Sequence, residues 1–230
     1  MLSELKEAIL HYIPVFPIVL FVLSRYKMKI YDLKLYSTGR VYEGNGDSNL
    51  HFLACVVYTF LITGMVSAAG IPSVIDFGFG INYLNFNFIP FAVNGVSTNV
   101  LNVIMFVPFG FMLPIMWNEF ESFKKTVEVG FLFSLFIEIT QMFNFRATDV
   151  DDLMMNTLGT VIGFGIYYIL FVKIFKKKES NNSFRSKLRM GSSYKSVFYS
   201  WSEFVDLTVL TIVSYAIIGS LVRNYCFLFI

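Results

Sequence analysis

The chain has 230 residues, of which 56% are hydrophobic, 18% aromatic and only 15% charged. Soluble domains carry about a quarter charged residues, so this composition, with a mean hydropathy of +0.63, excludes an ordinary soluble domain. The net charge of +2 says little by itself. No nucleic-acid partner and no cofactor are implied, and Cys55 and Cys226 indicate neither a disulfide framework nor a metal site.

Six apolar stretches approach the roughly 20 residues that a membrane-spanning helix needs. The first lacks a small-residue cleavage site, so we expect it to remain as a helix. The third is interrupted by Pro108, Gly110 and Pro114, which predicts a broken span, and Glu203 and Asp206 weaken the sixth. The stretches cover residues 8–23, 52–69, 100–117, 127–143, 153–172 and 204–222.

The fold class that follows is all-α: a polytopic transmembrane helix bundle of about six spans, with an interfacial outer loop. We expect an N-terminal span and basic loop over residues 1–51 and a central membrane domain over 52–172. A basic segment and a final span follow over 173–230. The segment 173–202 is either a solvated linker or a polybasic patch that touches anionic lipid.

Orientation follows from the basic residues, because loops rich in Lys and Arg stay in the cytoplasm. Of the 18 Lys and Arg residues, 15 fall in the loops after the first, third and fifth stretches. The loops after the second and fourth stretches therefore face outward. The first of these, residues 71–98, alternates apolar and Asn residues at 81–91, which favours an extended or re-entrant segment in the membrane interface.

Polar residues gather at the predicted outer ends of three spans. Glu138 and Gln141 are three residues apart and share a helix face. A carboxylate inside the membrane costs about 2.5 kcal/mol or more, so we expect Glu138 to face the bundle interior. The spacing of Asp149, Asp152 and Asn156 places them on one face of the fifth span. The candidate ligand-binding set is Asn99, Asn102, Glu138, Gln141, Arg146, Asp149, Asp152 and Asn156.

Simpler interpretations of these residues stay open. Thr148 and Asp151 resemble a capping box, and Asn99 has the character of a helix cap. Arg146 either extends to lipid headgroups, pairs with Asp149, or clamps a phosphate or carboxylate. Capping does not explain why the same face continues into a seam of small residues, Gly159 and Gly163, which permits close helix contact.

Two segments resemble the signatures of the VanZ-like family. NVLNVIMFVPFGFMLP at 99–114 is similar to the first, and IEITQMFNFRATDVDDLMMNTLGTVIG at 137–163 is similar to the second. NFIPF at 87–91 also fits, and the resemblance extends over residues 52–172. It implies a bacterial multi-pass membrane protein, and the family takes its name from a protein associated with resistance to teicoplanin, a lipid-anchored glycopeptide antibiotic. No established biochemical mechanism comes with it.

Three functions compete. The first is non-enzymatic binding of a lipid-linked or amphiphilic molecule, such as a cell-wall precursor or a glycopeptide, at the outer leaflet. The second is an intramembrane enzyme acting on a lipid headgroup, with Glu138 as acid or base and Asp149 and Asp152 holding a cation. The third is a small transporter or flippase. We favour the first, because no nucleophile and no second broken segment are evident.

Overall fold

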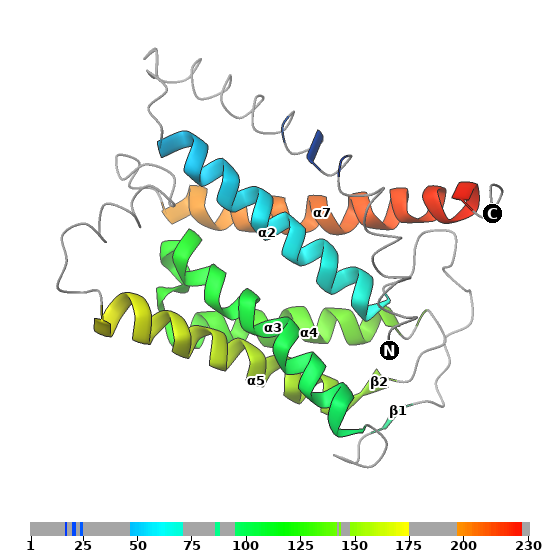
Figure 1. Cartoon of the computed structure of the whole chain (residues 1–230), viewed down its shortest axis with the longest axis horizontal. Helices are drawn as coiled ribbons and strands as arrows, with labels where there is room; N and C mark the ends of the chain where they lie inside the picture. The colour runs from blue at the N-terminus through cyan, green and yellow to red at the C-terminus, as the bar shows by residue number, and fades with distance from the viewer. Residues whose placement is uncertain are drawn as a thin grey trace.

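The computed structural model describes residues 47–70, 86–87, 95–141, 143, 148–174 and 197–226, and the single positions 17, 20, 21 and 24 (Figure 1). This part of the chain is all-α, apart from two strands of two residues each. The first predicted span, the basic segment 175–196 and Arg146 lie almost wholly or wholly outside it. The helices are α2 (Asp47–Ala69), α3 (Val96–Met116), α4 (Phe123–Gln141), α5 (Val150–Tyr167) and α7 (Val197–Cys226).

Short elements connect these helices. The 3-10 helix η1 (Asn118–Glu121) joins α3 to α4, and the π-helix η3 (Tyr168–Ile174) continues α5. The strands β1 (Phe86–Asn87) and β2 (Thr148–Asp149) pair in parallel, with Asn87 opposite Asp149. Part of the predicted extended outer segment therefore lies beside the start of α5, and the last residues of the predicted loop form the start of α3.

The bundle has two distinct ends (Figure 1). At one, called here the strand end, α2 and α4 finish, α3 and α5 begin, and β1 pairs with β2. At the other, called here the η1 end, α2, α4 and α7 begin and α3 finishes. The predicted polar residues that the structure describes lie toward the strand end, and a second group of buried polar residues lies at the η1 end.

The closest helix packing joins α3 to α5 and depends on glycine. A methyl group added at Gly163 would clash with the backbone oxygen of Val107 and lie 2.8 Å from the backbone nitrogen of Phe111. Gly159 lies equally close to the backbone of α3, and Gly110 faces the backbone of Thr160. The predicted small-residue seam is thus confirmed as a contact in which two helix backbones approach without intervening side chains.

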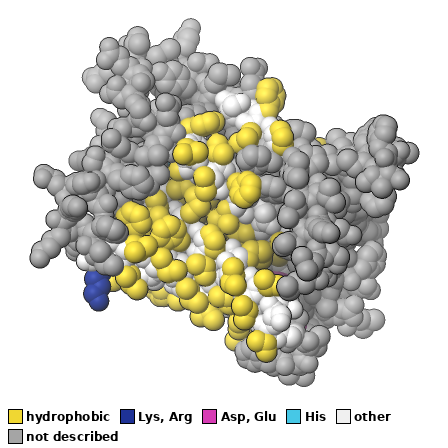
Figure 2. Space-filling view, viewed as in Figure 1, with side chains coloured by type: hydrophobic (Ala, Val, Ile, Leu, Met, Phe, Trp, Pro, Cys, Tyr) yellow, Lys and Arg dark blue, Asp and Glu magenta, His cyan; other side chains and the backbone are white. Residues whose placement is uncertain are grey.

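The outer surface of the bundle is apolar. Three helical segments are long and apolar enough to cross a membrane, namely His51–Ala69, Val96–Met116 and Val150–Phe171. Hydrophobic side chains cover most of the described surface in one view, interspersed with backbone and uncharged polar side chains (Figure 2). On α5 the exposed side chains recur every fourth residue, at Met154, Leu158, Ile162 and Ile166. A surface of this kind is stable against lipid rather than water, which indicates a membrane protein.

Six spans are not confirmed, because only three described segments meet the length and hydropathy requirements of a span. The predicted break in the third span is not confirmed either. The segment α3 is helical throughout, with Pro108 and Pro114 inside it. It also begins four residues earlier than predicted, with Gly95 at its N-cap, so the capping interpretation of Asn99 is wrong.

Candidate functional site

Seven of the eight predicted site residues are described, and all seven lie toward the strand end. The three on α4 and α5 that point inward are almost fully buried, with Glu138 and Asn156 each 2% exposed and Gln141 6% exposed. The prediction that Glu138 faces the bundle interior is confirmed. The predicted residues do not form one uniform cluster, however, because their hydrogen bonds connect three different pairs of elements.

Glu138 and Asp149 connect α4 to the beginning of α5. The backbone N–H of Asp149 donates to Glu138 Oε2 at 3.3 Å. Asp149 is itself the N-cap of α5, and its side chain accepts the backbone N–H of Asp151 at 3.0 Å. Two carboxylates thus lie at a helix N-terminus, where the helix dipole favours negative charge. The predicted capping box on Thr148 is wrong by one residue, because Asp149 is the cap.

Two α5 residues, one and two turns further along the helix, contact the two neighbouring helices. Asn156 Nδ2 donates to Ser134 Oγ of α4 at 3.0 Å. Asp152, which is half-buried, accepts from Asn102 Nδ2 of α3 at 2.6 Å. Gln141 is used differently, because its Nε2 donates to the backbone oxygen of Ala69 at 2.6 Å and so ties α4 to the end of α2.

Two amide oxygens at this end are buried acceptors. Within the described part of the chain, Asn99 Oδ1 and Asn156 Oδ1 receive no hydrogen bond. A buried polar atom left without a partner costs about 1–3 kcal/mol. Two such acceptors at the end of the bundle that also holds Asp149 and Asp152 therefore favour a partner that brings hydrogen-bond donors.

The contact between Asn102 and Asp152 gives a direct test of the packing at this end. We expect Asn102→Ala and Asp152→Ala to be non-additive, with a coupling energy of roughly 1–2 kcal/mol, because the pair joins an amide donor to a carboxylate away from bulk water. A double-mutant cycle on unfolding of the purified protein in detergent measures this quantity. Additive effects of the two substitutions would show that the two side chains do not interact.

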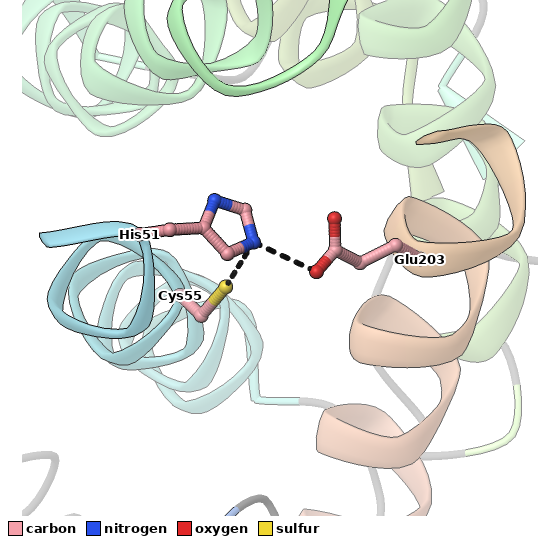
Figure 3. Close-up of side chains that lie close together, drawn as sticks. All are labelled: His51, Cys55 and Glu203. Carbon is pink, nitrogen blue, oxygen red and sulfur yellow. Dashed lines mark hydrogen bonds and ion pairs between the residues drawn. The ribbon is translucent and has the colours of Figure 1, made fainter. Parts of the chain in front are cut away.

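A second polar group lies at the η1 end and was not predicted. His51 and Cys55 of α2 and Glu203 of α7 place their ligand atoms within 4.8 Å of one another (Figure 3). Among the described residues, Asp149 and Asp152 join no such group of potential metal ligands. The spacing of His51 and Cys55, one helical turn apart, was an available signal. Their approach to Glu203 across 152 positions of sequence was not visible in any local pattern.

The apolar surface, the spanning helices and the buried polar contacts at the strand end define a helical membrane protein. The chain belongs to the VanZ/LLP1 family, whose family model matches residues 50–172. It is similar to the protein VanZ of Enterococcus faecium, with 35% identity over 91 residues, which cover 39% of this chain and 56% of that protein. The chain thus spans little more than half the length of this relative. No solved structure matches the chain.

Proposed function

We propose that the strand end binds the headgroup of a lipid-linked or amphiphilic molecule in the outer leaflet of the membrane. The positive-inside pattern of the loops supports this orientation, since it assigns the loops on either side of β1 and before β2 to the extracytoplasmic face. The observation that carries the proposal is a pair of buried amide oxygens, of Asn99 and Asn156, which have no hydrogen-bond partner among the described residues and lie toward the end of the bundle that also holds the buried Asp149.

The chemistry of these groups selects the class of ligand. Carboxylates and amide oxygens accept hydrogen bonds, so they suit a headgroup rich in hydroxyl, amide or ammonium donors. Such donors are abundant in sugars and peptides. A lipid-linked cell-wall precursor and a lipid-anchored glycopeptide both carry them.

The apolar surroundings suit a molecule that also has an acyl or prenyl chain. Val100 and Ile104 of α3 and Leu158 of α5 are exposed within two helical turns of the contact between Asn102 and Asp152. A hydrocarbon tail lying along these side chains would extend parallel to the helices, while its headgroup stays at the strand end. Membrane lipid is the partner that this surface requires in any case.

Family membership supports a role in antibiotic tolerance. The resemblance to the VanZ-like family connects the chain with teicoplanin, whose lipid anchor and peptide donors fit the ligand class above. On this proposal the chain lowers the sensitivity of the cell to the glycopeptide, because it binds either the antibiotic or the lipid-linked molecule that the antibiotic reaches at the membrane.

Expression in a teicoplanin-sensitive bacterium tests the proposal. We expect the wild-type chain to raise the inhibitory concentration of teicoplanin, and Asp152→Asn to return it close to that of the empty vector, because the carboxylate that Asn102 orients is neutralised. The matched control is Glu128→Gln, which removes an exposed carboxylate from α4 near the η1 end and should leave tolerance unchanged. Tolerance that survives Asp152→Asn at equal protein levels would contradict the proposed site.

The enzyme and transporter alternatives have distinct outcomes. Conversion of a labelled lipid-linked precursor by the purified protein would show that the protein is an enzyme and not only a binding protein. Movement of that precursor across a proteoliposome membrane would show that the protein is a transporter. The hydrogen bonds that join Glu138 to the start of α5 and Asp152 to α3 favour a binding role over catalysis, since both contacts also hold the bundle together.

A further inference from the structure

Three side chains of different chemistry converge at the η1 end of the bundle. His51 Nε2 lies 2.8 Å from Glu203 Oε1 and 3.4 Å from Cys55 Sγ (Figure 3). His51 and Cys55 are almost fully buried, and Glu203 is half-buried. Cys55 carries a free thiol. These groups lie far from the strand end and take no part in the function proposed above.

The arrangement differs from that of a nucleophile activated by a base. In such a triad the nucleophile and the orienting carboxylate contact opposite nitrogens of the imidazole ring, so that one nitrogen takes the proton of the nucleophile while the other N–H donates to the carboxylate. Here the thiol and the carboxylate approach the same nitrogen, His51 Nε2. The three ligand atoms therefore lie within 4.8 Å of one another, close enough to bind one metal ion together.

Two of the three separations between the ligand atoms are close to those around a small divalent ion, and the third is within 4.8 Å. Metal–ligand bonds of about 2.0–2.3 Å in a tetrahedral site require ligand atoms about 3.3–3.7 Å apart. The pair of His51 Nε2 and Cys55 Sγ already has this separation, at 3.4 Å. The Glu203 oxygen, at 2.8 Å, needs to withdraw by only about half an ångström to reach it.

A neighbouring aromatic side chain holds the carboxylate in place. Trp117 Nε1 donates to the second oxygen, Glu203 Oε2, at 3.3 Å. The indole ring is 1% exposed and packs edge-on against Tyr58 and Phe204. Outer contacts of this kind orient metal ligands in proteins, and they leave Oε1 directed toward His51.

We propose that His51, Cys55 and Glu203 bind one late first-row divalent metal ion, with Zn²⁺ as the best match. Imidazole, thiolate and carboxylate together suit zinc, and three protein ligands leave a fourth position for water or another ligand. Binding replaces the thiol proton of Cys55, which is released to solvent, and it also displaces the Nε2 proton that His51 donates to Glu203, so that the bound imidazole keeps only the proton on Nδ1. Because the ligands come from α2 and α7, the ion links these two helices.

The test uses the full-length protein, purified in detergent and freed of metal with a chelator. We expect equilibrium dialysis to give one Zn²⁺ per chain, and Co²⁺ to produce a sulfur-to-cobalt charge-transfer band. Cys55→Ser and His51→Ala should each weaken binding at least about tenfold and remove the band. The controls Cys226→Ser and His11→Ala delete the other cysteine and the other histidine and should leave both readouts unchanged.

Two results would overturn the proposal: substoichiometric binding of both ions by the wild-type chain, or binding that Cys55→Ser and His51→Ala retain. If these variants fail to fold, alkylation of the wild-type protein tests the same site. Zn²⁺ should slow maleimide labelling of Cys55 at least about tenfold, measured by peptide mass spectrometry. An unchanged labelling rate would count against the site.

Discussion

Glu138→Ala is expected to destabilise the purified protein by about 2–4 kcal/mol and to abolish ligand binding at the strand end. The substitution removes the carboxylate oxygen that accepts the backbone N–H of Asp149, the residue that caps α5. It also leaves a cavity at a position that is 2% exposed. Thermal or denaturant unfolding in detergent measures the loss.

Glu138→Gln distinguishes the effect of the Glu138 charge on ligand binding from the contribution of its hydrogen bond to stability. The amide keeps an oxygen that can accept the Asp149 N–H, so we expect it to retain most of the stability that Glu138→Ala loses. It removes the negative charge from the group of acceptors, so it should still weaken binding. Glu128→Gln is the matched control, because it makes the same change at an exposed position of the same helix. Equal stability of the alanine and wild-type proteins would show that this contact does not hold α5 in place.

Gly163→Ala is expected to destabilise the protein by about 1–3 kcal/mol, although alanine is the better helix former. The added methyl group would clash with the backbone of Val107, and two packed helix backbones have little freedom to separate. The effect should appear as a lower unfolding temperature in detergent and as reduced accumulation in the membrane.

The control for this substitution lies on the same helix. A methyl group at Gly165 would meet nothing within 4 Å, so Gly165→Ala should leave stability unchanged or raise it by up to about 1 kcal/mol. If the change in stability has opposite signs at Gly163 and Gly165, close packing and not helix propensity decides the effect at Gly163. A Gly163→Ala protein as stable as the wild type would contradict the observed α3–α5 contact.

Simple periodicity was enough to predict part of this architecture. The burial of Glu138 followed from the cost of a carboxylate in lipid, and the glycine seam followed from the four-residue spacing of Gly159 and Gly163. Both depend only on which face of one helix a residue occupies. The second to sixth stretches therefore coincide with described helices, with boundaries displaced by up to seven residues, as at the start of α7, and the first stretch lies almost wholly outside the described residues.

The partners of individual side chains could not be predicted, because they depend on how helices rotate against one another. Asp152 and Asn156 share a broad face of α5, yet one reaches α3 and the other reaches α4. Gln141 was assigned to the site and instead bonds the backbone of Ala69. Arg146 stays a prediction, since it lies outside the described residues. The approach of His51 to Glu203 joins helices that are distant in sequence, and no local pattern encodes it.

The most direct measurement is binding of teicoplanin and of a lipid-linked cell-wall precursor to the protein in lipid nanodiscs. We predict saturable binding of one of these probes to the wild-type chain and to Glu128→Gln. Affinity should fall at least about tenfold in Glu138→Gln and Asp152→Asn, because each loses a charge-assisted hydrogen bond to the headgroup. Absence of saturable binding by the wild-type chain, or equal affinity in all four proteins, would contradict a binding site at the strand end.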